Sequence, residues 1–239
     1  MTDAAEALLL TTAMDWGLHL TTQQLAQFAA YAAALVRWNE HTNLTTITQR
    51  EAIYVRHFLD SLALAPHLGR KPTSLVDLGS GAGFPGLPLK LVYPELTLLL
   101  VDSVGKKTAF LQHVVAHLGL EGVRVVTGRA EELGHDPGER ERHSLVTARA
   151  VADLRVLVEY AMPLLHLGGR LIAPKGRDAA HEADAAAVAL AQLGGSLNAI
   201  VPVQLPGLDP RALIVIEKIS PTPSRYPRPN GIPVRRPLK

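Results

Sequence analysis

Leu75-Val76-Asp77-Leu78-Gly79-Ser80-Gly81-Ala82-Gly83-Phe84-Pro85-Gly86 is an apolar run followed by a glycine-rich turn. Further along the chain, Leu98-Leu99-Leu100-Val101-Asp102-Ser103 is a second apolar run, and it ends in an acid. Glycines let a backbone approach a ligand closely, and an acid after the next strand can accept hydrogen bonds from ribose hydroxyls. The two stretches together predict a nucleotide-like cofactor bound across the ends of two parallel strands.

The glycine spacing separates two cofactor classes. A dinucleotide fingerprint has the form G-x-G-x-x-G, whereas Gly79, Gly81 and Gly83 give G-x-G-x-G and position 84 is Phe. Asp77 precedes these glycines, where a carboxylate would repel a pyrophosphate but would favour a cationic ligand through water. S-adenosylmethionine carries an ammonium and a sulfonium group, so the pattern favours it. The simpler alternative is a glycine-rich turn that binds nothing.

The composition excludes several classes of site. The length of 239 residues predicts one large or two small domains, and a content of 47% hydrophobic and 19% charged residues is typical of a globular protein. The absence of cysteine excludes disulfides, a thiolate zinc site and a cysteine nucleophile. The histidines have no metal-ligand spacing such as H-E-x-x-H, so we expect no metal; a lone histidine such as His57 is usually structural. No signal-like start or membrane-length apolar run is present, so we expect a cytoplasmic protein.

Positive charge is concentrated at the C-terminal end. The net charge is +2, but residues 219–239 contain five basic residues and no acid, whereas the remainder carries 19 basic against 22 acidic side chains. Such a patch predicts a polyanionic partner. Six prolines in the same segment are expected to exclude a regular helix. This leaves two alternatives, a disordered tail and an extended basic arm.

From residue 74 onward, strand and helix patterns alternate, which predicts a parallel sheet covered by helices. The expected strands are 74–78, 97–102, 123–127, 144–148 and 170–174, with helices at 86–92, 106–118 and 153–166. Earlier helices are expected at 3–16, 22–40 and 49–68, and a later one at 178–193. Strands near 197–203 and 212–218 are expected to form an antiparallel hairpin that turns at 206–210. The predicted regions are a helical extension (1–70), a Rossmann-like core (71–218) and a basic proline-rich arm (219–239).

Charged residues follow three further strands. Glu131 comes after the third strand, Arg149 ends the fourth and Lys175 ends the fifth. Ligand sites in open α/β sheets lie at the carboxyl ends of the strands, so these side chains are candidates for contacts with cofactor or substrate. The alternatives are structural: Asp102 as a helix cap, Glu131 as a solvated acid, and Arg149 in an ion pair with Asp153 or Glu159.

These motifs resemble those of the bacterial small-subunit ribosomal RNA guanine-N7 methyltransferases, also called the glucose-inhibited division protein B family. The resemblance covers nearly the whole chain. Besides the glycine turn and Asp102-Ser103, the matching residues are Trp38-Asn39, Asn43-Leu44-Thr45, His57, Asp60-Ser61-Leu62, Lys106-Lys107, Gly128-Arg129-x-Glu131, Arg149-Ala150, Lys175-Gly176, Tyr226-Pro227-Arg228 and Gly231-x-Pro233. Pro229-Asn230 departs from the family, which often places another basic residue there.

The resemblance implies an α/β fold of the class I S-adenosylmethionine-dependent methyltransferase type. This is a Rossmann-like, seven-stranded, mostly parallel sheet with an N-terminal helical extension. It implies methyl transfer from S-adenosylmethionine to N7 of one guanine of 16S rRNA near the decoding site, within the 30S subunit or its precursor. The implied cofactor contacts are Gly79, Gly81, Phe84, Asp102, Ser103, Val104, Ala130, Glu131 and Arg149. The residues expected to hold RNA phosphates are Lys106, Lys107, Arg129, Lys175, Arg225, Arg228, Arg235 and Arg236.

This chemistry needs few special groups. Guanine N7 carries a free lone pair at neutral pH, so no general base is required, and catalysis is mainly alignment of the two reactants. We therefore expect no essential histidine. We expect Arg149 to contact the cofactor and to orient the guanine through O6, which arginine recognises well.

Three competing functions remain open at the level of sequence. A small-molecule methyltransferase would share the cofactor half but would have no use for a basic arm. A nicotinamide-dependent oxidoreductase is disfavoured by Asp77 and by Phe84 within the glycine spacing. A non-catalytic RNA-binding or assembly factor on the same scaffold is the third, because the proposed chemistry has no diagnostic nucleophile.

Overall fold

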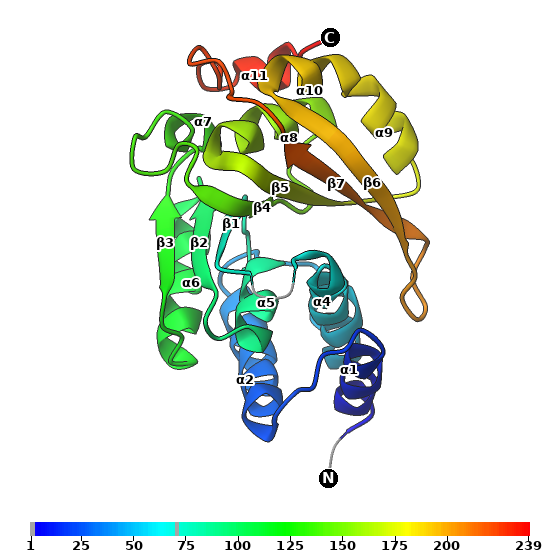
Figure 1. Cartoon of the computed structure of the whole chain (residues 1–239). Helices are drawn as coiled ribbons and strands as arrows, with labels where there is room; N and C mark the ends of the chain where they lie inside the picture. The colour runs from blue at the N-terminus through cyan, green and yellow to red at the C-terminus, as the bar shows by residue number, and fades with distance from the viewer. Residues whose placement is uncertain (1–2, 70–71) are drawn as a thin grey trace.

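The sheet has seven strands in the order β3-β2-β1-β4-β5-β7-β6 (Figure 1). The computed structural model describes residues 3–69 and 72–239. The strands are β1 (Ser74–Leu78), β2 (Thr97–Asp102), β3 (Val123–Thr127), β4 (His143–Thr147), β5 (Leu165–Lys175), β6 (Gly195–Val203) and β7 (Arg211–Lys218). Strands β1 to β5 pair in parallel, and β7 runs antiparallel between β5 and β6. The expected seven-stranded, mostly parallel sheet and its terminal hairpin are confirmed.

Helices cover both faces of the sheet, and a separate apolar cluster fills each interface. One face carries α2 (Thr22–Asn39), α5 (Gly86–Val92) and α6 (Gly105–His117). The other carries α7 (Ala130–Leu133), α8 (Leu154–Ala161), α9 (Ala179–Ala185) and α10 (Ala187–Leu193). This layering leaves the carboxyl ends of β1, β2 and β4 to be covered by loops and by the N-terminal helices.

The N-terminal helices pack against the glycine turn. After α1 (Ala4–Asp15) and α2, the chain forms α3 (Arg50–Ile53), a π turn (Tyr54–Leu59), α4 (Asp60–Leu62) and a short 3-10 turn (Ala65–His67). Tyr31 of α2 donates a hydrogen bond to the carbonyl of Ala82 in the turn, and its ring stacks on Phe84 with centroids 5.4 Å apart. The helical extension therefore fixes the position of the turn.

Several boundaries differ from the expected ones. The helix expected at 153–166 ends earlier: α8 stops at Ala161, a 3-10 turn contains Pro163, and β5 begins at Leu165. The helix expected at 178–193 is broken at Ala186 into α9 and α10. The expected boundary between extension and core falls at residues 70–71, which lie outside the described part.

The C-terminal arm, residues 219–239, contains one helical turn, α11 (Ile232–Arg235), which lies near α8 (Figure 1). The expectation that the prolines exclude a regular helix there is wrong for this one turn. Pro233 occupies the first turn of α11, where a backbone N–H is not needed for helical hydrogen bonding. Within the described residues, no helix is both long enough and apolar enough to cross a membrane.

A candidate two-cavity site at the carboxyl ends of the strands

The turn after β1 depends on glycine. Gly79 has φ +65°, and a Cβ atom there would lie 2.5 Å from a methyl carbon of Val151. Gly83 has φ +94°, and a Cβ atom there would lie 2.6 Å from the hydroxyl of Tyr31. Positive φ and close packing both exclude larger side chains, so the turn keeps its backbone open toward the end of β2.

Asp102 lies at that end of β2 and is 5% exposed. Its Oδ2 accepts a hydrogen bond from the amide of Gly81 (2.9 Å), and its Oδ1 accepts one from the amide of Val104 (2.9 Å). Each carboxylate oxygen has a second lone pair. The side chain therefore braces the glycine turn and can also accept hydrogen bonds from a ribose. Lys107 Nζ lies 3.8 Å from Oδ2.

A cavity of about 350 Å³ opens beside Asp102; we call it the cofactor cavity. Its lining includes six of the residues expected to contact the cofactor, namely Gly79, Asp102, Ser103, Val104, Ala130 and Glu131. Three others lie outside it: Gly81, Phe84 and Arg149. Phe84 is buried between Tyr31 and His57, so its side chain supports the turn from below. The size of the cavity and its two buried acids, Asp102 and Glu131, fit an adenosyl group.

Glu131 is a buried acid, 5% exposed, and so it is not a solvated one. It belongs to the short helix α7, which the sequence analysis did not anticipate. Its Oε1 accepts hydrogen bonds from the hydroxyl of Tyr160 (3.2 Å) and from the amide of Gly231 (3.0 Å). Burial and the neighbouring Glu131 raise the pKa of Tyr160 above its usual range, so Tyr160 stays a donor.

Asp77 is completely buried beneath the turn. Its Oδ2 accepts a hydrogen bond from the amide of Gly86 (2.9 Å), but among the described residues its Oδ1 has no partner. Burial raises the pKa of this carboxyl to about 7. Asp77 does not line the cofactor cavity, so the fit of the residues present to S-adenosylmethionine rests on Asp102, on Glu131 and on the open glycine turn.

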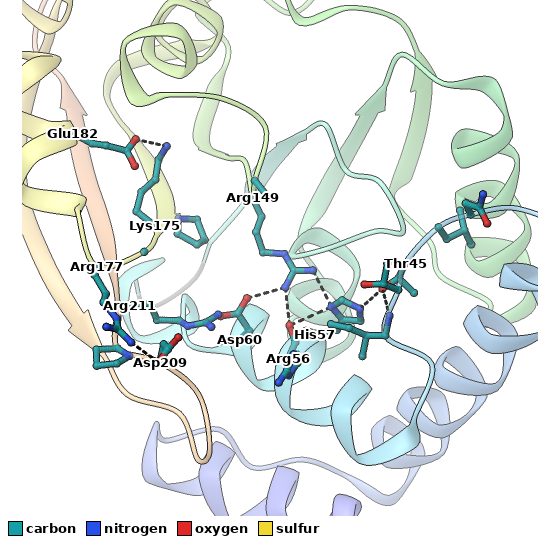
Figure 2. Close-up of a pocket in the computed structure, with 18 residues that line it drawn as sticks. Thr45, Arg56, His57, Asp60, Arg149, Lys175, Arg177, Glu182, Asp209 and Arg211 are labelled. Carbon is teal, nitrogen blue, oxygen red and sulfur yellow. Dashed lines mark hydrogen bonds and ion pairs between the residues drawn. The ribbon is translucent and has the colours of Figure 1, made fainter.

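A second cavity, of about 1000 Å³, lies between the N-terminal helices and the β6–β7 hairpin; we call it the substrate cavity (Figure 2). Arg149 and Lys175 line it, as expected for residues at the ends of β4 and β5. Arg149 Nη1 donates to Asp60 Oδ2 over 2.8 Å, and Arg211 donates to the other oxygen of the same carboxylate. The alternative ion pairs of Arg149 with Asp153 or Glu159 are not formed.

His57 lies beside Arg149 and stacks on Phe84, with ring centroids 4.4 Å apart. Arg149 Nη2 lies 3.2 Å from Nδ1, and Thr45 Oγ1 lies 3.0 Å from Nε2. Nδ1 also lies 3.2 Å from the backbone carbonyl of Arg56, so a donor, Arg149, and an acceptor, this carbonyl, both face the same ring nitrogen. Burial and the charge of Arg149 lower the pKa of His57 to about 4. His57 is therefore neutral at pH 7.

The two cavities meet at Ala150, which lines both of them and has φ +56°. This residue follows Arg149 directly. A ligand in the substrate cavity and a cofactor in the cofactor cavity would approach each other at this point.

The cations expected to hold phosphates have different surroundings. Lys106, Arg129, Arg225, Arg235 and Arg236 are exposed, and Lys107 and Arg129 line the cofactor cavity. Lys175 pairs with Glu182 at 2.7 Å. Arg228 pairs with the completely buried Glu159 at 2.6 Å. Lys175 and Arg228 are thus engaged within the protein.

Sequence reasoning missed three members of the substrate cavity as functional residues. Thr45 and Asp60 stood within quoted motifs but were given no role, and Arg211 was not singled out. Thr45 and Asp60 could have been found, because both stand in the family motifs close to His57. Arg211 stands in no such motif. The position of Arg211 depends on how the hairpin lies against the N-terminal helices.

A family model described as "rRNA small subunit methyltransferase G" matches residues 24–206. The "Ribosomal RNA small subunit methyltransferase G" of Roseiflexus castenholzii is 54% identical, covering 96% of this chain and 98% of that protein. The protein of the same name from Chloroflexus aggregans is 54% identical over 100% of both chains.

Solved structures resemble this chain at low sequence identity. A point mutant of MtNAS in complex with S-adenosylmethionine has a TM-score of 0.55 and 15% identity, covering 90% of this chain and 77% of that one. Precorrin-6y C5,15-methyltransferase from Geobacter metallireducens has a TM-score of 0.51 and 15% identity, covering 72% and 90%. These likenesses show the fold, which is that of the class I methyltransferases.

Proposed function

The chain belongs to the rRNA small subunit methyltransferase G family, and from that premise we propose that it transfers a methyl group from S-adenosylmethionine to N7 of one guanine in 16S rRNA near the decoding site. The observation that carries this proposal is the meeting of two cavities at Ala150. One has the buried acids and open glycine turn that suit an adenosyl cofactor. The other is larger and is lined by arginines.

When bound, S-adenosylmethionine supplies the activated methyl group. On the protein side, in this proposal, Asp102 accepts hydrogen bonds from the ribose, and Glu131 and the backbone of Ala130 recognise the adenine. Arg149 orients the guanine from the substrate cavity. No residue has to remove a proton, because N7 offers a free lone pair, and His57 is held as a neutral support for Arg149.

The character of the substrate cavity favours RNA over a small apolar substrate. Arg56, Arg149, Lys175, Arg177 and Arg211 line it together with only three acids, Asp60, Glu182 and Asp209. This excess of cations suits a phosphate backbone near the target base. The substrate in this proposal is the 30S subunit or its precursor, and the protein would act in the cytoplasm, where ribosomes are assembled.

The test is transfer of labelled methyl from S-adenosylmethionine to 30S subunits that lack the modification, followed by mapping of the methylated base. A single N7-methylguanine in 16S rRNA is the expected result. Methylation of naked 16S rRNA in parallel identifies the preferred form of the substrate. Cofactor binding without any RNA methylation would overturn the proposal and would favour a small substrate or a non-catalytic assembly role.

A further inference from the structure

Backbone carbonyl groups in the first part of the C-terminal arm contact polar side chains of the core. Arg140 donates to the carbonyls of Thr222 (2.9 Å) and Tyr226 (2.8 Å), and His135 Nε2 lies 2.7 Å from the carbonyl of Pro227. Tyr226 is 5% exposed, so the arm contributes to the apolar cluster on this face of the sheet. These contacts give the arm a fixed path.

Arg228 is the strongest attachment. Its guanidinium donates to both oxygens of Glu159 at 2.6–3.1 Å, and its backbone amide donates to Glu159 Oε1 at 2.8 Å. Glu159 is completely buried in α8. The bidentate pair raises the pKa of Arg228 above its usual range. A charge-assisted, bidentate contact of this kind also fixes the orientation of Arg228. From there the backbone of the arm continues toward the cofactor cavity.

Beyond this attachment, the arm reaches the cofactor cavity at two points. The amide of Gly231 donates to Glu131 Oε1 (3.0 Å), and Val234 of α11 lines the cavity. Tyr160 donates to the same oxygen of Glu131, so within the described residues both hydrogen bonds fall on Oε1. Oε2 is then left to accept a hydrogen bond from a ligand, such as one from the amino group of adenine.

We propose that residues 231–239 form a wall of the cofactor cavity and hold Glu131 in position, and that they therefore set the affinity for S-adenosylmethionine. This inference rests on the proposed function in taking S-adenosylmethionine as the ligand. Glu131 is the residue that would touch the cofactor, and Gly231 is a positioning residue that acts through it. Val234 contributes the wall itself.

The first experiment compares the full chain with a truncation that ends at Pro229 and so keeps the Arg228–Glu159 attachment. Calorimetric titration with S-adenosylmethionine is expected to show an affinity lower by about tenfold or more in the truncated protein. The melting temperature of the ligand-free protein should change little. The matched control is Asn230→Ala, which removes only the exposed hydrogen bond to Glu132 (2.7 Å) and should leave the affinity unchanged. Equal affinities of the truncated and full-length proteins would overturn the inference.

A double-mutant cycle tests whether the arm acts through Glu131. Glu131→Ala is made in the full chain and in the truncation, and the cofactor affinity of all four proteins is measured. If Gly231 positions Glu131, truncation has a much smaller effect in the Glu131→Ala background. Fully additive effects would overturn the positioning role.

A substitution tests the wall without shortening the chain, in case the truncation fails to fold. Val234 and Val188 are both exposed helical residues, at 59% and 50%, but only Val234 lines the cofactor cavity. Val234→Trp is expected to weaken cofactor binding about tenfold, and Val188→Trp is expected to leave it unchanged. Identical cofactor affinities in the two variants would contradict the claim that Val234 forms part of the wall of the cofactor cavity. A full chain that binds the cofactor but methylates no RNA would overturn the proposed function and leave this inference standing.

Discussion

Arg149 Nη1 lies 2.8 Å from Asp60 Oδ2, which joins the end of β4 to the N-terminal helices. The same carboxylate accepts a hydrogen bond from Arg211 at the start of β7, and Asp60 is only 5% exposed. Two guanidinium groups therefore share one carboxylate at the floor of the substrate cavity (Figure 2). Two positive charges face one negative charge, so this part of the cavity keeps a net positive charge. That charge can bind a phosphate or the O6 atom of a guanine.

The first prediction concerns Asp60→Asn. This variant keeps the shape of the side chain but removes the charge that holds both arginines. We expect a loss of roughly 2–4 kcal/mol in the free energy of unfolding, because one partner of a largely buried ion pair is removed. Single-turnover methyl transfer should fall about 100-fold, because Arg149 is no longer aligned. Urea denaturation and rapid-quench assays measure the two effects.

Asp153→Asn provides the control for Asp60. Asp153 also pairs with an arginine, Arg155, but both side chains are well exposed, at 41% and 32%. The cost should be below about 1 kcal/mol. If both variants lost equal stability and kept full activity, the role given to Asp60 would be wrong.

The second prediction separates two roles of Arg149. Because Arg149 lines the substrate cavity and not the cofactor cavity, Arg149→Ala should lower turnover about 100-fold, equivalent to about 2.7 kcal/mol of transition-state stabilisation. Cofactor affinity should change little. Arg149→Lys should not restore activity, since an ammonium cannot contact Asp60 and His57 together. Turnover and calorimetric Kd are measured on the same preparations; a matched fall in cofactor affinity would instead assign Arg149 to the cofactor site, as the family resemblance implies.

The cofactor half of the site could be predicted from the sequence because it obeys a local rule. Gly79 follows β1, Asp102 ends β2 and Glu131 stands shortly after β3, and the carboxyl ends of parallel strands converge at one edge of a sheet. A strand pattern is enough to place such residues. The substrate half has no such rule: Asp60 and Arg211 stand far apart in the sequence and meet only because the start of α4 lies against the start of β7.

The C-terminal arm shows a different limit of sequence reasoning. A count of charges identified a basic segment, but it could not distinguish a solvated cation from one paired inside the protein. Arg228 belongs to the second kind because its partner, Glu159, lies on the buried side of α8. The short helix α7 was missed for a related reason: its four residues are too few to show a helical period.

The third prediction is a pH dependence of stability that arises from His57. Its pKa is lowered from 6.5 to about 4, so the folded protein binds fewer protons than the unfolded chain between these values. His57 therefore contributes stability that is complete above pH 6.5 and is lost as the pH falls toward 4, by roughly 3 kcal/mol in total. Asp77, whose pKa is raised to about 7, has the opposite sign over nearly the same range.

The two variants His57→Gln and Asp77→Asn separate these opposing contributions. Relative to the unmodified protein, the free energy of unfolding of His57→Gln should fall more steeply as the pH rises from 4 to 6.5. That of Asp77→Asn should rise more steeply over the same interval. Guanidinium denaturation at several pH values gives the slopes, and parallel curves for all three proteins would contradict both assignments.

The fourth prediction divides the arginines of the C-terminal arm into two kinds. Arg225, Arg235 and Arg236 are exposed. Arg235 also donates to the carbonyl of Gly231 and Arg225 lies over the ring of Tyr226, so replacing all three with alanine should cost only a little stability. If they hold phosphates, the slope of log K against log salt for RNA binding should become shallower by about 2–3, since each phosphate contact contributes roughly 0.7–0.9. Filter binding at a series of salt concentrations measures this slope, and an unaltered slope would remove these arginines from the RNA interface.

Arg228→Met should behave in the opposite way. It leaves the buried carboxylate of Glu159 without its guanidinium, which we expect to cost roughly 3 kcal/mol or more in the free energy of unfolding. The double variant Arg228→Met with Glu159→Leu should recover most of this loss, because an apolar pair of similar volume needs no compensating charge. If Arg228→Met instead kept full stability and only made the salt slope shallower, Arg228 would be a phosphate contact after all. The attachment that directs the arm toward Glu131 would then have to lie elsewhere.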